Sequence, residues 1–282
     1  MPVTPTIAVS SWSVHRTLGL TWWDSPAAAA IEKEAYGPGS LAILDLPAAV
    51  ARHGIKRLQI CHFHVASRDK TWIGEFRAAL ADAGVMLQTL LIDDADISHP
   101  VDHRRDVAWV GGWIDTAAEL GAGSARVVAG KQRPTRDALA LSVAGLKELA
   151  RRGKSQGVRV ITENWFDLLS GPREVNHVLD GVGDDLGLLA DFGNWKGPGK
   201  YDDLAAILPG AEDTHAKASF SASDGMDGDD FGRCVAAAVA ARYDGPYTLI
   251  YDGPGDDEWA GIETERRFIH DFQPRQPARR SA

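Results

Sequence analysis

The chain has few cysteines, since Cys61 and Cys234 are the only two among 282 residues. They lie far apart and in no spacing typical of metal ligands, so a disulfide framework is not expected and a reducing compartment suits the count. The chain also lacks a basic start followed by an apolar run, and no stretch approaches the roughly 18 apolar residues that span a bilayer. We therefore expect a cytoplasmic protein with no membrane partner.

Positive charge is scarce as well, with 30 Lys and Arg against 39 Asp and Glu and a formal net charge of −9. A nucleic-acid backbone would be repelled unless one face were locally basic, so we expect no nucleic-acid partner. Three sequence motifs are missing. The chain has no G-x-S-x-G motif, so a hydrolase nucleophile elbow is not supported. No G-x-G-x-x-G motif follows the first apolar run, so nicotinamide or flavin binding is not supported either. Asn194 stands where a phosphate-binding P-loop needs glycine.

What the chain does contain is a repeating pattern of short apolar, β-rich runs. They begin at residues 7, 58, 87, 126, 158, 186, 214 and 247. Most gaps are about 30 residues, the length of a strand, a crossover helix and two loops. Eight strands alternating with about eight helices indicate an α/β fold, a single-domain (β/α)8 TIM barrel over residues 1–272. A doubly wound open sheet is the alternative, and residues 273–282 are predicted to form a disordered polar tail.

The segments between the runs are predicted to be helices. Residues 106–123 carry an apolar stripe and end in a glycine-rich stop. Residues 135–153 begin after Thr135 as the N-cap and carry a second apolar stripe of Leu139, Val143, Leu146 and Ala150. Residues 229–245 and 257–272 fill the last two positions.

The segment between the first run and its helix, residues 17–40, forms a long loop after strand 1 in this prediction. An excess loop on the strand-to-helix side of a barrel lies at the active-site face, although a plain surface excursion is the alternative. Trp22 and Trp23 within it favour a lid or a sugar-stacking wall, because exposed aromatic rings suit the apolar faces of sugars.

Metal-competent side chains follow four consecutive runs of the predicted barrel: Glu163, Asp191, His215 and Asp252. Residues just past the carboxyl end of each strand converge on one mouth, so we expect these four to meet. A single acid after a strand is more often a helix cap, but four in register predict a metal site. Three carboxylates and one imidazole suit Mn²⁺, Mg²⁺ or Co²⁺ better than structural zinc, and Mn²⁺ is favoured.

Further polar and aromatic residues near the predicted mouth are candidates for substrate contacts. His62 and His64 lie two apart and are expected to share the inward face of a strand, with outward packing against helices as the alternative. Lys217 stands two residues from His215, where a cation could steady a developing oxyanion. The complete set of predicted substrate-binding residues is His62, His64, Asn164, Asn194, Lys217, Trp12 and Trp22.

The pattern "ITEN… LLADFGN… THAK… LIYDGPGD" resembles the xylose isomerase-like TIM barrels, in particular the sugar phosphate isomerase/epimerase group, over roughly residues 7–272. The resemblance implies a divalent-metal-dependent isomerase or epimerase of a small ketose-like carbohydrate. Its chemistry would be proton abstraction through a metal-stabilised enediolate, with Glu163 as base and Asp252 or a histidine returning the proton. The family usually has Glu as the last ligand; Asp252 is one methylene shorter, and Glu258 is the alternative.

Other activities remain open at this point. The same metal and base would serve a lyase or dehydratase on an oxidised sugar or inosose, including C-glycoside cleavage, if a leaving group departs instead. A metal-free binding scaffold and an abasic-site endonuclease are less favoured, the second because of the negative net charge. Pairing into a homo-oligomer also stays open.

Overall fold

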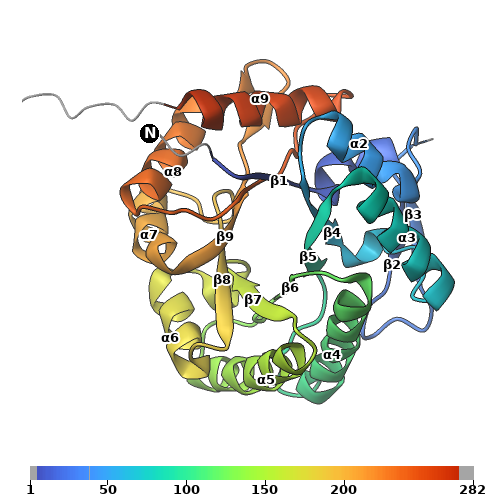
Figure 1. Ribbon diagram of the computed structural model, residues 1–282. Helices are drawn as coiled ribbons and strands as arrows, with labels where there is room; N and C mark the ends of the chain where they lie inside the picture. The colour runs from blue at the N-terminus through green and yellow to red at the C-terminus, as the bar shows by residue number, and fades with distance from the viewer. Residues whose placement is uncertain (1–4, 38, 273–282) are drawn as a thin grey trace, which may run out of the picture.

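Eight parallel strands close into a barrel in the computed structural model, which describes residues 5–37 and 39–272 (Figure 1). Around the barrel the order is β1-β12-β9-β8-β7-β6-β5-β4. The strands are β1 (Ile7–Ser10), β4 (Arg57–Cys61), β5 (Met86–Ile92), β6 (Ser124–Val127), β7 (Arg159–Glu163), β8 (Leu186–Asp191), β9 (Ala211–Ala216) and β12 (Tyr247–Leu249). Because β1 pairs with both β12 and β4, the ring is closed, and the open-sheet alternative is wrong.

The barrel strands coincide with the eight predicted apolar runs. Nearly all of their residues are buried, as β8 illustrates with six buried residues out of six. Parallel strands read as continuous apolar runs because one face fills the barrel and the other packs under helices. Polar residues therefore stand out at the strand ends, where they face the mouth.

Helices surround the barrel, as the ring in Figure 1 shows. The main ones are α2 (Leu46–Arg52), α3 (Lys70–Ala83), α4 (His103–Leu120), α5 (Arg136–Ser155), α6 (Pro172–Val182), α7 (Lys200–Ile207), α8 (Gly228–Ala240) and α9 (Glu258–Asp271). The Thr135 hydroxyl accepts from the backbone N–H of Ala138, so the predicted N-cap of α5 is confirmed. Leu146 and Ala150 of the predicted α5 stripe are buried, together with Ala138 and Ser142, whereas the predicted Leu139 and Val143 are only half-buried.

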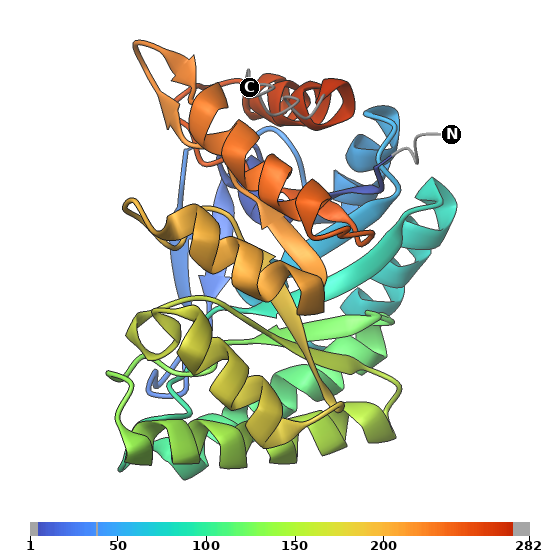
Figure 2. The same ribbon diagram turned by 90° about the vertical axis from the view of Figure 1, so that its left-hand side faces the viewer.

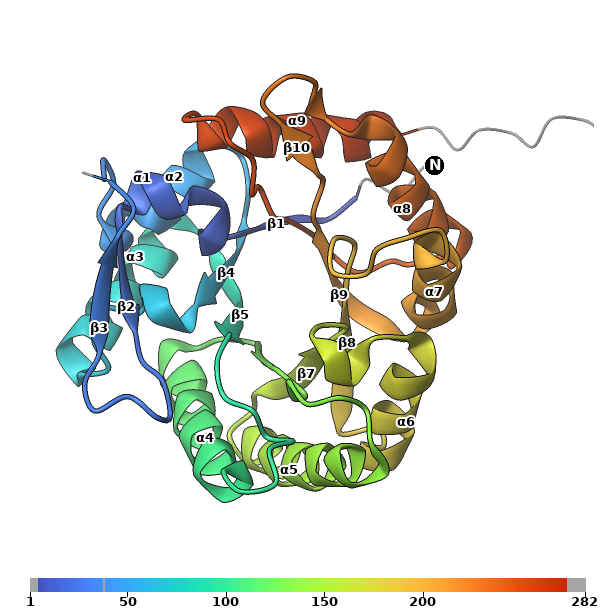
Figure 3. The same cartoon turned by 180° about the vertical axis from the view of Figure 1, so that it is seen from behind.

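The long segment after β1 contains regular structure where a loop was expected. A short helix, α1 (His15–Leu18), leads into an antiparallel hairpin of β2 (Leu20–Trp23) and β3 (Glu32–Ala35). Figure 3 views the barrel from the side on which this hairpin lies. A second small hairpin, β10 (Phe220–Ser221) with β11 (Gly225–Met226), projects on the same side in Figure 2. Both hairpins follow the carboxyl ends of barrel strands, so they border the mouth.

Within the described part of the chain, no helix is long and apolar enough to cross a membrane. The predicted tail, residues 273–282, lies outside the described residues.

Candidate metal centre

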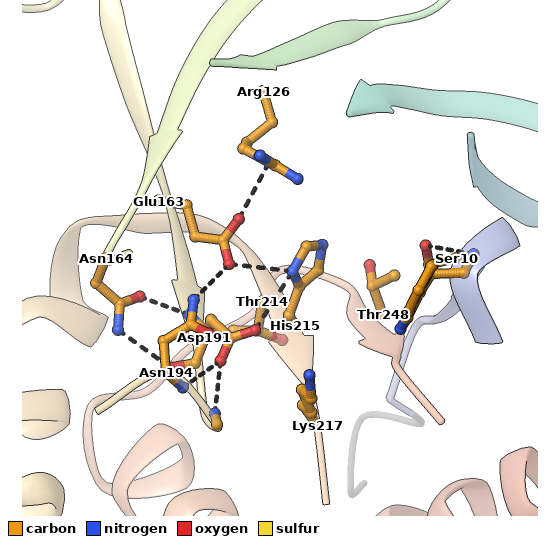
Figure 4. Close-up of polar contacts among 12 residues, drawn as sticks. Ser10, Arg126, Glu163, Asn164, Asp191, Asn194, Thr214, His215, Lys217 and Thr248 are labelled. Carbon is orange, nitrogen blue, oxygen red and sulfur yellow. Dashed lines mark hydrogen bonds and ion pairs between the residues drawn. The ribbon is translucent and has the colours of Figure 1, made fainter. Parts of the chain in front are cut away.

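Three buried side chains meet at the carboxyl ends of neighbouring strands. Glu163 is the last residue of β7, Asp191 is the last residue of β8, and His215 lies just before the end of β9. The strand register sets Asp191 directly beside His215. The ligand atoms of all three lie within 4.8 Å of one another, and Figure 4 shows the side chains turned toward a common point.

The imidazole of His215 presents one nitrogen to the carboxylates and the other to the barrel interior. Its Nδ1 lies 3.4 Å from Glu163 Oε1 and 3.5 Å from Asp191 Oδ2. Its Nε2 lies 2.9 Å from Gln59 Oε1, and because that oxygen only accepts, Nε2 donates and Nδ1 is left for a cation. Burial lowers the pKa of His215, but the two carboxylates outweigh it and raise the pKa to about 9.

A group of hydrogen-bonded polar side chains beneath the metal centre fixes the orientation of Gln59. The Nε2 of Gln59 donates to Asp213 Oδ2 at 2.7 Å and lies 2.9 Å from Thr248 Oγ1. Asp213 also accepts from Gln88 Nε2 at 2.6 Å, and burial raises the pKa of Asp213 to about 6. Since a carboxylate accepts from the Gln59 amide nitrogen, the amide oxygen must face His215. The sequence prediction did not find this group, because its members precede the strand ends.

The two predicted asparagines hold the carboxylates in place. Asn164 accepts from the backbone N–H of Asp191 at 2.7 Å and donates to its carbonyl at 3.1 Å. Asn194 donates from Nδ2 to Glu163 Oε1 at 2.8 Å, and its backbone N–H donates to Asp191 Oδ1 at 2.7 Å. Burial raises the pKa of Asp191, but the hydrogen bond and charge of His215 hold it below the usual value. Asp191 Oδ2 is thus the oxygen turned toward His215.

Arg126, on β6, is a buried cation that pairs with the carboxylates near the metal centre. The sequence prediction missed it. Its Nε lies 3.0 Å from Glu163 Oε2, and its guanidinium also pairs with Asp93. The side chain is 2% exposed, so this cation stands in a low-dielectric site between two carboxylates. Burial raises the pKa of Asp93, but Arg126 and His62 outweigh it and hold it well below its usual range. An arginine inside the apolar run "RVVA" was the available signal.

Asp252 does not join the group of three. Its carboxylate is 40% exposed and lies 2.9 Å from Lys217 Nζ, with which it forms an ion pair. Burial lowers the pKa of Lys217, but Asp191 and Asp252 outweigh it and raise the pKa above its usual value. Ile250, two residues earlier in the chain than Asp252, contributes an apolar side chain to the wall of the cavity above the metal centre, which is described below. The structure thus brings together three of the four predicted ligands. Glu258, the alternative fourth ligand, accepts hydrogen bonds from backbone N–H groups of α1.

The donor set suits a divalent cation. Two carboxylates and the Nδ1 of His215, whose proton a bound cation would displace, form an oxygen-rich set that suits Mg²⁺ and Mn²⁺. Glu163 Oε1 faces His215 Nδ1 at 3.4 Å, whereas Oε2 is ion-paired with Arg126, so Oε1 is the oxygen turned toward the centre. Among the described residues, this is the one group of three or more acidic, histidine or cysteine side chains close enough to hold an ion.

A cavity of about 400 Å³ opens above the three side chains and is called the inner cavity below. Aromatic rings make much of its wall: Trp12, Trp23, Phe63, Trp165 and Phe166. Asn194 and Lys217 line it as well, whereas Asn164 lies behind it. Of the two tryptophans predicted for this wall, Trp23 lines the cavity and Trp22 does not, because successive side chains of β2 point to opposite faces.

His62 and His64 are not on a strand, so the expected inward-facing pair on one strand face is wrong. β4 ends at Cys61, and His62–His64 form a 3-10 turn that breaks the alternation. Cys61 and Phe63 line the inner cavity, while the two histidines lie buried behind it. His62 contacts the carbonyl of Asp24 through Nε2 at 3.1 Å, so it ties the β2–β3 hairpin to the barrel.

A family model described as "Xylose isomerase-like TIM barrel" matches residues 47–272, which is most of the chain. The chain belongs to this family. Membership confirms the resemblance drawn from the strand-end motifs, and the Glu163, Asp191 and His215 centre lies at the mouth of this xylose isomerase-like barrel. A search of curated proteins found no match.

Solved structures share the fold at low sequence identity. A xylose isomerase-like barrel protein from Mycobacterium smegmatis in complex with magnesium is 17% identical, with a TM-score of 0.65 over 95% of this chain and 97% of that one. D-allulose 3-epimerase from Methylomonas sp. in complex with D-allulose is 15% identical, with a TM-score of 0.69 over 96% and 98%. A 3-keto-D-glucoside 4-epimerase from E. coli is 14% identical, with a TM-score of 0.62 over 80% and 93%.

Proposed function

We propose that this chain is a divalent-metal-dependent isomerase or epimerase of a ketose-like sugar. The observation that supports it most is the buried Glu163, Asp191 and His215 group at the mouth of a xylose isomerase-like barrel. Two of the similar structures are sugar epimerases and one contains magnesium, which agrees with this chemistry. We expect the protein to act in the cytoplasm on a small carbohydrate, with Mn²⁺ or Mg²⁺ as the favoured ion.

A divalent ion held by Glu163, Asp191 and His215 would supply Lewis-acid polarisation of a substrate carbonyl. Glu163 is our proposed general base: its carboxylate lines the inner cavity and is held by Asn194 and Arg126. It would remove the proton from the carbon next to the carbonyl, giving an enediolate-like species. Arg126, 3.0 Å from Glu163 Oε2, keeps positive charge beside the base throughout.

The returning proton would come from the Lys217–Asp252 pair. Both side chains line the inner cavity, and their charged atoms lie 2.9 Å apart. In Figure 4 Lys217 and Glu163 lie on different sides of His215, a separation that would suit epimerisation, in which the proton leaves one face of the sugar and returns to the other. In this account Asp252 acts with Lys217 in proton return and not as a metal ligand.

The test is solvent deuterium uptake into D-fructose, D-allulose and L-ribulose by the Mn²⁺-loaded protein, followed by NMR. We expect uptake at one carbon next to the carbonyl, and Glu163→Gln should lower its rate by about 10²- to 10⁴-fold, the usual contribution of a general base. Glu75→Gln, an exposed change on α3, is the control and should leave the rate unchanged. Near wild-type uptake by Glu163→Gln would exclude Glu163 as the base.

A lyase acting on an oxidised sugar or inosose is the second candidate, and the Lys217–Asp252 pair would serve it equally well. An ammonium group next to the cavity can protonate a departing oxygen as readily as a carbanion. Product analysis separates the two activities, because an epimer keeps all its atoms whereas an elimination product has lost water or a glycosidic partner.

A further inference from the structure

A second hollow lies directly beside the inner cavity. It has a volume of about 680 Å³ and is called the outer hollow below. The two share a boundary of five side chains: Trp165, Phe166, Asn194, Lys217 and Asp252. The inner cavity, at about 400 Å³, already lies within the range of about 300–1,000 Å³ that small ligands occupy. A monosaccharide at the metal centre would therefore leave the outer hollow without a role.

Phe166 stands at this boundary in a conformation that needs an explanation. Its backbone has φ 56° and ψ 178°, a region that glycine adopts and phenylalanine avoids. The residue is 36% exposed, so its side chain is accessible from the two spaces that it borders. Strain of this kind persists only where surrounding structure enforces it, and it concentrates at ligand-binding sites.

The neighbours of Phe166 hold its ring in this position. Trp165 stacks on it with ring centroids 4.3 Å apart and an interplanar angle of 22°. Cations lie over both rings, Lys131 Nζ at 5.4 Å from the Phe166 centroid and the Arg126 guanidinium at 5.2 Å from the Trp165 centroid. Since Arg126 is also paired with Glu163, the aromatic pair is coupled to the metal centre. Trp165 and Phe166 thus form an aromatic wall at the boundary between the inner cavity and the outer hollow.

The charges of the outer hollow select against an anionic ligand. Four carboxylates line it, Asp167, Asp203, Asp230 and Asp252, against two ammonium groups, Lys196 and Lys217. A third ammonium group, Lys200, pairs with Asp230 at 2.7 Å, so these side chains together carry one excess negative charge. Lys217 is already paired with Asp252, so it is not free to bind a phosphate. Carboxylates accept hydrogen bonds from hydroxyl groups, and an amide such as that of Asn194 both accepts and donates them. Exposed aromatic rings pack on the apolar faces of sugars. An uncharged polyhydroxylated ring fits this lining.

We propose that the substrate is a glycoside, whose ketose-like unit lies in the inner cavity and whose second, uncharged sugar ring lies in the outer hollow against Phe166. This inference rests on the proposed function and adds a substrate class to it. Phe166 is then a specificity-determining residue, because it contacts the second ring and not the reacting carbons. The site would disfavour sugar phosphates.

The experiment compares ligands that share one ketose. The Mg²⁺-loaded protein is titrated calorimetrically with D-fructose and with glucosyl-fructoses linked through O3, O4 or O6 of the fructose. We expect at least one glucosyl-fructose to bind at least about tenfold more tightly than D-fructose, a difference of about 1.4 kcal/mol. Phe166→Gly relaxes the backbone and removes the ring, so it should weaken the disaccharide at least about tenfold more than it weakens D-fructose and thereby abolish this preference. Phe166→Tyr keeps the ring and should retain the preference.

Equal affinity for D-fructose and all three disaccharides would overturn the proposal, as would absence of binding by all four sugars. A Phe166→Gly variant that weakens D-fructose and disaccharide equally would overturn it too. Solvent deuterium uptake, measured on the same samples, keeps the two hypotheses apart. Uptake into D-fructose without any disaccharide preference refutes the glycoside alone, whereas a disaccharide preference without uptake into any ketose refutes the proposed reaction alone.

Discussion

The two halves of the barrel mouth are built differently. On one half, β7, β8 and β9 stay regular up to the residues that form the metal centre, Glu163, Asp191 and His215. On the other half, β1 and β4 pass directly into 3-10 turns, Ser11–Val14 and His62–His64, which bring aromatic and apolar side chains to the cavity. Regular strand ends therefore position the charged side chains of the metal centre, while the 3-10 turns supply the apolar wall of the inner cavity above them.

The largest effect should come from comparing the two aspartates that were both predicted as ligands. Asp191→Asn keeps the side-chain oxygen that caps Gly193 and Asn194 but removes the charge facing His215. We expect Mn²⁺ affinity to fall more than the roughly 10- to 100-fold typical of losing an outer partner. Asp252→Asn should change affinity by less than about threefold, because Asp252 pairs with Lys217. Electron paramagnetic resonance of free Mn²⁺ measures both; similar losses would make Asp252 a ligand.

The next effect concerns the hydrogen bond beneath the centre. Gln59→Leu removes the acceptor for His215 Nε2, which should weaken Mn²⁺ binding by about 10- to 100-fold. Gln88→Leu is the matched control, because Gln88 donates to the same Asp213 carboxylate but does not contact His215. If both variants weakened the metal equally, the effect would belong to Asp213 and not to the orientation of the imidazole.

A third comparison lies on the hairpin of the other half. Trp23 lines the inner cavity and stacks on Phe63 with centroids 4.1 Å apart, whereas its neighbour Trp22 faces away. Trp23→Ala should raise the KM for the reacting sugar by about tenfold, which corresponds to about 1.4 kcal/mol. Trp22→Ala should leave the KM within about twofold. Steady-state kinetics on the two variants decide between them, and a larger effect at Trp22 would contradict the hairpin geometry.

The features that the sequence predicted correctly and those that it missed divide between the same two halves of the mouth. The ligands of β7, β8 and β9 were predictable because strand spacing and apolar runs locate the carboxyl ends of strands. His62 and His64 were misplaced because a 3-10 turn begins where the strand was assumed to continue. Arg126 and Gln59 went unrecognised, since their roles depend on side-chain contacts with other strands that periodicity does not reveal. The side of β2 that faces the cavity likewise depends on hairpin register.

The smallest effect concerns Glu265, a fully buried residue of α9 outside the metal centre. Burial raises its pKa well above the usual value, and its Oε2 has no hydrogen-bond partner. A carboxyl whose folded pKa is raised takes up a proton on folding, so its contribution to stability is present at low pH and is lost as pH rises. Glu265→Gln should therefore raise Tm more at pH 8 than at pH 5, by about 2–4 °C.

Glu263→Gln on the same helix is the control for that measurement. Slight burial raises the pKa of Glu263, but its ion pairs with Arg266 and Arg267 outweigh it and lower the pKa. A lowered carboxyl pKa gives stability that is present at high pH, so this variant should show no gain at pH 8. Equal Tm shifts at both pH values for Glu265→Gln would show that Glu265 folds as a charged group.

The most direct test of the central claim is metal binding to the wild type and to His215→Ala. Each protein is stripped with chelator, titrated with Mn²⁺ or Mg²⁺ by calorimetry, and checked for bound ion by mass spectrometry. The account predicts about one equivalent of ion bound by the wild type and loss of that binding in His215→Ala, with the fold retained by circular dichroism. A wild-type protein that binds no divalent ion, or a His215→Ala variant that binds one as tightly as the wild type, would contradict it.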